Sequence, residues 1–157
     1  MRNGSLKPAG DLDATGLRFA VVAARWNSRV TDRLLAGAVR TLKSAGARTG
    51  DVSVVRVPGS FELISACRRA ATDGNVSAVV SLGCLIRGET PHFEVLAHSV
   101  ATALAHLNAS QDVPISFGVL TCDNEEQARD RSGGKGGHAG IEAAAAAIEM
   151  ARLREAR

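Results

Sequence analysis

Short apolar segments alternate along this chain with segments of helical periodicity, and this alternation is the feature that most constrains the fold. Four runs rich in β-branched and apolar residues occur at 18–24, 51–57, 76–84 and 114–121. Each is followed by a segment whose apolar residues recur every three or four positions. Strands that are apolar at nearly every position are buried on both faces, which is typical of a parallel sheet. The alternation therefore predicts an α/β domain with helices on both faces of the sheet.

Capping residues indicate where the predicted helices begin. The expected caps are Ser28, Ser60, Thr90 followed by Pro91 at the first helical position, and Asp123 with Glu126 in a capping box. A glycine-rich stretch at residues 133–137 follows the short helix that this box opens, and a last helix follows the glycines. Because right-handed crossovers restrict how the strands connect, only a few doubly wound topologies remain.

The composition indicates one globular domain. A chain of 157 residues with 45% hydrophobic content can bury a sizeable core. We expect this domain to span residues 17–157 and residues 1–16 to form a flexible polar arm, without the apolar stretch of a secretory signal. No run of 18 apolar residues occurs, so we expect no membrane association.

The cysteines and the charge narrow the possible functions. Cys67, Cys84 and Cys122 are odd in number and match no metal-ligand spacing, so we expect no disulfide, no metal site and a cytoplasmic location. The net charge is only +3 and aromatic residues make up 3% of the chain, which argues against nucleic-acid binding. A small phosphorylated ligand fits this charge better.

Polar and aromatic residues gather where the predicted strands end. In parallel sheets this edge is where ligands bind. The segments that leave it are Arg25–Asn27, Pro58–Glu62, Ile86–His92 and Thr121–Asn124. The clustering of functional side chains at one edge is the main physical argument for a binding site.

Two of these residues, Trp26 and Glu62, could bind a flat ring and a polyhydroxylated chain. Trp26 is the only tryptophan, and its indole could stack on a flat heterocycle; alternatively, it packs the first helix onto the sheet. Glu62, after Gly59 and Ser60, could hold the hydroxyls of a sugar-like chain; alternatively, it only compensates the helix dipole.

The segment from Gly88 to His92 could bind a phosphate and supply a residue for proton transfer. Free amides at a helix N-terminus next to a flexible glycine form an anion site, to which Arg87 would add positive charge. His92 would reach a ligand bound there, and the helix dipole would favour its neutral form; alternatively, it is a solvated histidine. The other three histidines are expected at the surface: His98, His106 and His138.

Arg131 and Lys135 flank the glycine-rich stretch. A fixed guanidinium could bind a phosphate in a bidentate manner, although both residues could equally be ordinary solvated charges.

Taken together, these motifs resemble the lumazine synthase family from Arg18 to about Arg152. The matching pieces are Arg25–Asn27, Val57–Leu63, Leu82–Phe93, Phe117–Thr121, Glu125–Ala128 with Arg131, and Gly140–Ala144. The resemblance implies a single three-layer αβα sandwich of flavodoxin-like type, with a four-stranded parallel sheet in the order 2-1-3-4. It also implies a transferase of riboflavin biosynthesis. Such an enzyme condenses 5-amino-6-(D-ribitylamino)uracil with 3,4-dihydroxy-2-butanone 4-phosphate into 6,7-dimethyl-8-ribityllumazine, releasing phosphate and water without a cofactor.

The resemblance assigns roles to residues of this chain. Trp26 would stack on the pyrimidinedione, while Gly59, Ser60 and Glu62 would bind the ribityl chain. The catalytic residues would be His92, for proton transfer, and Arg131, for the departing phosphate. The other implied substrate-binding residues are Asn27, Phe61, Cys84, Leu85, Ile86, Glu89 and Thr90 at the phosphate, Phe117 and Lys135.

The resemblance also implies assembly. Phe117 and Arg131 would reach the site from a neighbouring subunit, so the active form would be a homo-oligomer built on pentamers. The sequence leaves open free pentamers, decamers and an icosahedral capsid of sixty subunits; the short 133–140 connection favours the capsid.

One departure from the family pattern leaves alternatives open. His138-Ala139-Gly140 stands where many members have Asn-Lys-Gly, and only Lys135 remains to contact the ring carbonyl. Slower catalysis, or a paralogue that binds flavin or lumazine without efficient turnover, is the main alternative. The related archaeal-type riboflavin synthase ranks below both, because the Gly88–His92 segment favours a phosphorylated substrate.

Overall fold

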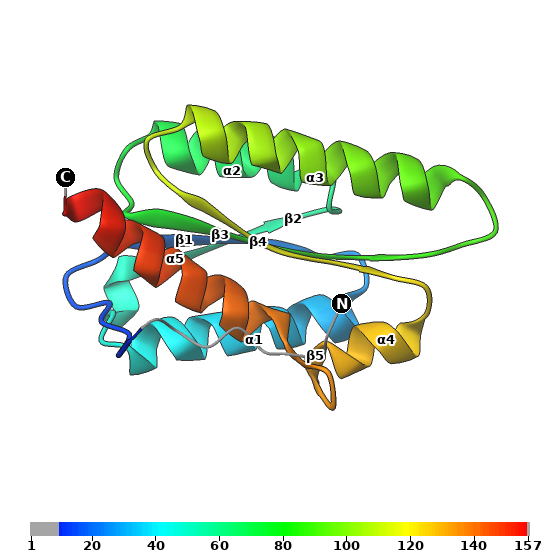
Figure 1. Ribbon diagram of the computed structural model, residues 1–157, viewed down its shortest axis with the longest axis horizontal. Helices are drawn as coiled ribbons and strands as arrows, with labels where there is room; N and C mark the ends of the chain where they lie inside the picture. Colours follow the sequence, from blue (N-terminus) through cyan, green and yellow to red (C-terminus); the bar gives the residue numbers. More distant parts are fainter. Residues whose placement is uncertain (1–9, 157) are drawn as a thin grey trace.

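A computed structural model describes residues 10–156 and contains a four-stranded parallel sheet (Figure 1). The strands are β1 (Phe19–Ala24), β2 (Val52–Val57), β3 (Ala78–Ile86) and β4 (Ile115–Cys122). Their spatial order is β2-β1-β3-β4, and every neighbouring pair is parallel. The predicted order 2-1-3-4 is therefore confirmed.

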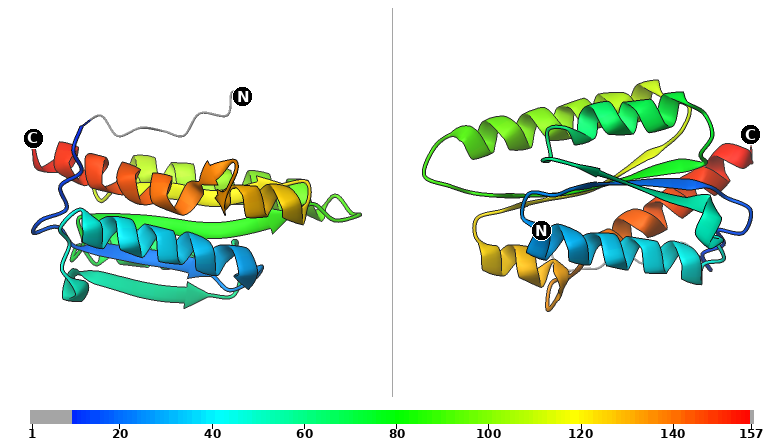
Figure 2. Two further views of the ribbon diagram at one scale, coloured as in Figure 1. Left: turned by 90° about the horizontal axis from the view of Figure 1, so that it is seen from below. Right: turned by 180° about the vertical axis from the view of Figure 1, so that it is seen from behind.

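Helices cover both faces of the sheet (Figures 1 and 2). One face carries α1 (Ser28–Ser44), α4 (Glu125–Asp130) and α5 (Ala139–Glu155), and the other carries α2 (Leu63–Thr72) and α3 (His92–Ser110). A 3₁₀ turn at Thr49–Asp51 precedes β2, and a small hairpin of β5 (Ser132–Gly134) and β6 (Gly137–His138) links α4 to α5. The chain thus has the predicted three-layer αβα architecture.

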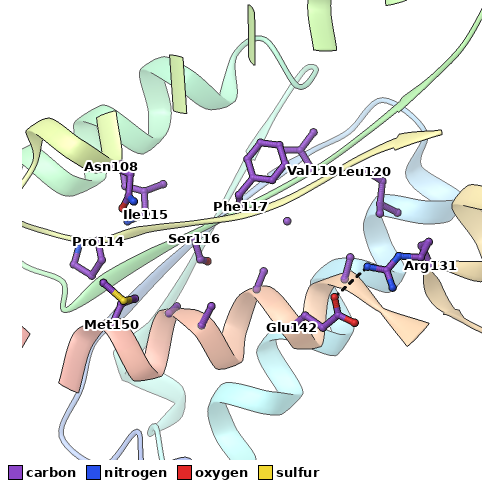
Figure 3. A pocket seen from close by; sticks show the side chains of 15 residues that line it. Asn108, Pro114, Ile115, Ser116, Phe117, Val119, Leu120, Arg131, Glu142 and Met150 are labelled. Carbon is purple, nitrogen blue, oxygen red and sulfur yellow. Dashed lines mark hydrogen bonds and ion pairs between the residues drawn. The ribbon is translucent and has the colours of Figure 1, made fainter. Parts of the chain in front are cut away.

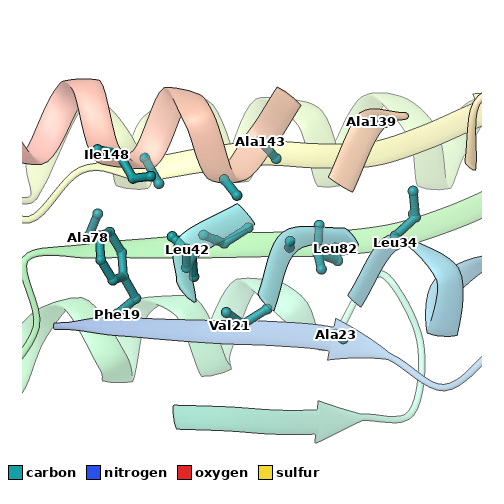
Figure 4. Packing of buried hydrophobic residues seen from close by; sticks show 14 of the residues in the cluster. Phe19, Val21, Ala23, Leu34, Leu42, Ala78, Leu82, Ala139, Ala143 and Ile148 are labelled. Carbon is teal, nitrogen blue, oxygen red and sulfur yellow. The ribbon is translucent and has the colours of Figure 1, made fainter. Parts of the chain in front are cut away.

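Two hydrophobic clusters hold the layers together. Successive residues of β1 point to opposite faces, so Phe19 and Val21 pack under α1 and α5, whereas Ala20 and Val22 pack under α2 and α3. Figure 4 shows Leu42 and Ile148 of the first cluster between the helices and the sheet. Both clusters consist of fully or nearly fully buried side chains. Strands β1 and β3 are therefore buried on both faces, as predicted. For β2 the prediction of burial is wrong, because this strand lies at the edge of the sheet and is exposed from residue 53 to residue 56.

Helices α1 and α5 cross at unusually short distance, because glycine occupies two contact positions. A Cβ atom at Gly140 would lie 2.2 Å from the backbone oxygen of Leu34. A Cβ atom at Gly37 would lie 2.2 Å from the ring of His138, whose Nδ1 caps α5 by accepting from the amide of Ile141. His138 therefore packs against α1 and is partly buried, less solvated than the surface position expected from the sequence.

This packing makes the stability of the fold depend on pH. Burial lowers the pKa of His138, the charge of Arg40 on α1 lowers it further, and Glu142 on α5 acts in the opposite direction. Because the folded chain disfavours the protonated ring, we expect the free energy of unfolding to decrease as the pH falls below about 6.5, the ordinary histidine value. His138→Asn should remove that part of the decrease, whereas His106→Asn should retain it. Urea unfolding between pH 8 and pH 5 measures both, and equal pH profiles for wild type and His138→Asn would contradict the assignment.

The observed helix caps lie one or two residues away from the predicted caps. Asn27 rather than Ser28 is the cap of α1, Glu62 rather than Ser60 precedes α2, and Pro91 rather than Thr90 precedes α3. At α4 the cap is Asn124, whose side chain accepts from the amide of Gln127 at 2.9 Å, one position after the predicted box. Of these four caps only Asn124 makes a side-chain capping hydrogen bond, and differences of one or two residues are common at helix ends.

The segment before β1 packs against the C-terminal helix. Residues 1–9 of the predicted N-terminal arm lie outside the described residues. Ala14 is fully buried and its amide donates to the oxygen of Ala45, while Arg152 donates to the backbone oxygens of Asp13 and Thr15. The packed part of the chain therefore includes residues before the predicted boundary at residue 17. Among the described residues, no helix combines the length and the apolarity that crossing a membrane requires.

Candidate functional site

Strands β3 and β4 project beyond the end of β1 and form one side of the candidate site. Ala23, near the end of β1, pairs with Leu82, but β3 continues to Ile86. The projecting part of β3 stays paired with β4 as far as Cys122. The loops after β1 and β2 therefore lie beside the projecting ends of β3 and β4. The candidate site residues lie along these ends.

The loop after β1 is fixed to both neighbouring strands. The amide of Trp26 donates to the oxygen of Pro58 at 2.9 Å, so this loop lies beside the one that follows β2. Asn27 adopts a left-handed conformation (φ 58°), which asparagine tolerates better than most residues, and its Nδ2 donates to the oxygen of Cys84 at 2.9 Å. The Trp26 side chain is 73% exposed. It does not pack α1 onto the sheet, so that alternative is wrong.

The turn after β2 places a carboxylate and a hydroxyl beside this loop. The Oε2 atom of Glu62 accepts from the amide of Gly59 at 2.8 Å, which holds the carboxylate over the turn. Ser60 is 4% exposed, and its Oγ has no hydrogen-bond partner within the described chain. It fits against β3 only because Gly83 lacks a Cβ atom, which would lie 2.6 Å from that Oγ. Phe61 is exposed at the tip of the turn.

The connection from β3 to α3 contains the residues that were predicted to bind phosphate. Glu89 and Thr90 are exposed, and His92 is the first residue of α3, also exposed. As in any α-helix, the first amides of α3 have no partner within the helix and point toward this loop. The charge of Arg87 is not free, however, because its guanidinium pairs with Glu94 and Asp123.

The end of β3 contributes backbone rather than reactive side chains. Cys84 is 1% exposed, and burial raises the pKa of its thiol to about 12. Its sulfur therefore stays protonated at neutral pH and is a poor nucleophile. Leu85 and Ile86 are partly buried. Of these residues, Ile86 shares a pocket of about 720 Å³ with Trp26 and Asn27 on the α1 and α4 side of the sheet.

Phe117 and Arg131 lie together, but in a different pocket. They line a hollow of about 550 Å³ between β4 and α5, shown in Figure 3, which none of Trp26, residues 59–62 or residues 89–92 lines. Phe117 is half exposed. Arg131 donates through Nη2 to Oε2 of Glu142 at 3.1 Å and through Nη1 to the oxygen of Gly136. Other guanidinium N–H groups remain for a ligand, since the group has five.

Ala139 stands at the position where the sequence comparison above expected a second lysine, and this position is buried. Ala139 is 8% exposed, begins α5 and lines the same pocket as Arg131. Lys135 lies at the tip of the β5–β6 hairpin, 77% exposed, with its Nζ 3.3 Å from Asp130 and 3.9 Å from Glu126. No other cation from this hairpin replaces the missing charge within the described residues.

Apart from Lys135 at the hairpin tip, the predicted site residues thus form two groups on one chain. The first lies at the strand ends and holds Trp26, Asn27, residues 59–62, residues 84–86 and residues 89–92. The second is the pocket with Phe117 and Arg131. No sequence signal indicated that Glu142 would fix Arg131 from eleven positions away, or that Asn27 would donate to Cys84. Both depend on chain segments that only folding brings together.

An open parallel α/β sheet, with an exposed indole, a carboxylate and a helix N-terminus at its strand ends, defines a ligand-binding protein of the doubly wound class. Comparison with known proteins identifies the family. The 6,7-dimethyl-8-ribityllumazine synthase family matches residues 16–155, and the chain belongs to this family.

Individual relatives are similar over nearly their whole length. The enzyme of that name from Anaeromyxobacter dehalogenans is 49% identical over 92% of this chain and 89% of its own. The one from Thermotoga neapolitana is 49% identical over 93% and 88%, and the one from Nitratidesulfovibrio vulgaris is 43% identical over 93% and 94%. The resemblance seen in the strand-end motifs is therefore confirmed.

Proposed function

We propose that the chain is a 6,7-dimethyl-8-ribityllumazine synthase of riboflavin biosynthesis. It condenses 5-amino-6-(D-ribitylamino)uracil with 3,4-dihydroxy-2-butanone 4-phosphate and releases phosphate and water. The family membership supports this activity. The observation that carries it is the exposed indole of Trp26, tied by its backbone to the turn that holds the Glu62 carboxylate. A flat ring with a polyhydroxylated side chain matches this pair.

The uracil substrate binds at the first group of residues. Its ring stacks on Trp26, where contact with an aromatic face contributes about 1 kcal/mol. The ribityl hydroxyls donate to Glu62, whose carboxylate has acceptor sites beyond its bond to Gly59. The unpaired Oγ of Ser60 supports a polar ligand here, because a buried hydroxyl without a partner is costly.

The phosphorylated substrate binds where α3 begins. The backbone amides near Glu89 and Thr90, together with the positive end of the 19-residue helix, stabilise its phosphate. Arg131 of an adjoining subunit supplies the cation, since within one chain Arg131 lines a separate pocket. Arg87 is already paired and does not serve in its place.

The division of the site between two pockets supports assembly of several chains, which we propose takes the form of pentamers. The outer strands of the sheet leave apolar side chains exposed, with Val54 and Val55 on β2 and Phe117 on β4 each 43–50% accessible. These exposed apolar side chains lie on the two opposite edge strands of the sheet, where they support contacts with other subunits. We propose that Phe117 and Arg131 of one subunit complete the strand-end site of the next, and that pentamers close into an icosahedral capsid. The three free, buried thiols fit a cytoplasmic location.

The proposed reaction proceeds by alignment and proton transfer. The 5-amino group attacks the ketone and forms an imine with loss of water; phosphate is eliminated, and ring closure loses a second water. Holding both substrates in one site supplies much of the rate enhancement. His92, at the start of α3, moves protons between the intermediates, and Arg131 stabilises the leaving phosphate.

His92→Ala is expected to reduce kcat about 100-fold, the lower range for loss of a general acid–base. Because His92 is exposed and is not among the residues expected to hold either substrate, the KM values should change less than threefold. Steady-state assays give both quantities, and His106→Ala is the control histidine on the same helix. An unchanged kcat would remove His92 from the mechanism.

The decisive experiment mixes the purified chain with both substrates and follows lumazine fluorescence. Product formation supports the synthase. The exposed, already paired Lys135 and the buried Ala139 favour one alternative, a protein that binds flavin without efficient turnover. Tight riboflavin binding without product would identify that alternative, and neither product nor binding would contradict both.

A further inference from the structure

Arg87 joins three segments of the strand-end site. It is the first residue after β3, and its amide donates to the oxygen of Cys122 at 2.9 Å. Its Nε donates to Oδ1 of Asp123 at 2.8 Å, at the end of β4. Its Nη1 pairs with Oε1 of Glu94, and its Cζ lies 4.4 Å from the ring centroid of Phe93, both in the first turn of α3. One guanidinium therefore contacts both adjoining elements.

These contacts bracket the proposed phosphate-binding loop. The loop spans residues 88–91, between Arg87 and the start of α3. The pair of Arg87 with Glu94 connects the residue before the loop to the helix after it, and Asp123 fixes the same side chain to β4. The loop itself contains Gly88, where a Cβ atom would meet nothing within 4 Å. Arg87 thus restrains a loop that has little packing of its own at this glycine.

The charges indicate that Arg87 orients the loop rather than binds the phosphate. Two carboxylates surround one guanidinium, so the cluster carries a formal charge of −1 at neutral pH. The three side chains are 42–62% exposed, and exposed ion pairs contribute little to folding stability. What they fix is geometry, on which binding by backbone amides depends.

We infer that Arg87 is a positioning residue, which with Glu94 and Asp123 holds the 88–91 loop and the N-terminus of α3 in the conformation that binds a phosphate. This inference rests on the proposed function. When this restraint is lost, part of the free energy of phosphate binding is spent on ordering the loop, so the phosphate affinity falls. The uracil subsite, at Trp26 and Glu62, lies on other loops and should be unaffected.

The test measures inorganic phosphate affinity and the separate KM values for both substrates. Arg87→Met should weaken phosphate binding and raise the KM for the butanone phosphate about tenfold, with the KM for the uracil changed less than twofold. Arg87→Lys should recover part of the loss, since it keeps one ion pair. Arg154→Met removes a comparable exposed pair with Asp112 and should change neither constant. Unfolding midpoints of all variants should match the wild type.

The double variant Glu94→Gln with Asp123→Asn separates positioning from direct binding. If Arg87 bound the phosphate itself, removal of both carboxylates would free its charge and tighten phosphate binding. If Arg87 positions the loop, the same change weakens phosphate binding. Tighter binding, or wild-type constants for Arg87→Met, would overturn the inference. A wild-type chain that neither binds phosphate nor forms lumazine would instead contradict the proposed function.

Discussion

Gly140→Ala is expected to lower the free energy of unfolding by about 3 kcal/mol or more, at the upper end of overpacking costs. The added Cβ atom would lie 2.2 Å from the backbone oxygen of Leu34 and 2.8 Å from its Cα and carbonyl carbon. Backbone atoms cannot rotate away as a side chain does, so α1 and α5 would have to separate. The intrinsic preference of a helix for alanine over glycine, about 1 kcal/mol, would not compensate.

Urea unfolding at matched protein concentration measures this effect. Gly50→Ala is the control, because a Cβ atom there would meet nothing within 4 Å. It should change stability by less than about 0.5 kcal/mol. A wild-type midpoint for Gly140→Ala would show that the helices do not cross as closely as described.

Arg131→Ala is expected to reduce kcat/KM for the phosphorylated substrate by a factor of about 100 to 1,000. The guanidinium is held in place by Glu142 and the oxygen of Gly136, and a preorganised donor stabilises developing charge at little further cost. Arg131→Lys should recover only part of the activity, because lysine keeps the charge and loses the planar fork.

Steady-state kinetics with each substrate varied in turn measures this loss. Most of it should appear with the butanone phosphate, together with a weaker affinity for inorganic phosphate. Arg154→Ala, which breaks an exposed pair with Asp112, should leave kcat/KM within twofold of wild type. Unaltered phosphate affinity in Arg131→Ala would refute the assigned role.

Much of the fold could be predicted because its signals are local. Each of the four strands begins and ends within two residues of its predicted bounds, since continuous apolar runs such as the one containing Val79 and Val80 are buried on both faces. Helix starts were predicted less well. Pro91 has a helical φ but precedes α3 as its cap, one residue after the predicted cap Thr90.

The candidate site, like the fold, could be predicted only in part. The residue types at the strand ends, such as Trp26, Glu62 and His92, were apparent from the sequence because each follows a strand. The partners of these residues were not. Arg87 pairs with two carboxylates, so it is not the free cation expected beside the predicted phosphate-binding loop. The ring of His138 packs against Gly37 of α1, so this histidine is partly buried and not fully solvated.

The sequence alone determined the layered parallel architecture, the family resemblance and the set of polar residues at one sheet edge, because periodicity and strand–loop order are written along the chain. Only the tertiary structure decided that Glu142 fixes Arg131, that Asn27 holds the first loop to β3, and that Phe117 and Arg131 lie in a pocket separate from Trp26. The physical reason is that hydrogen bonds, ion pairs and close packing act across space. Residues far apart in sequence meet only where the backbone brings them within a few ångströms.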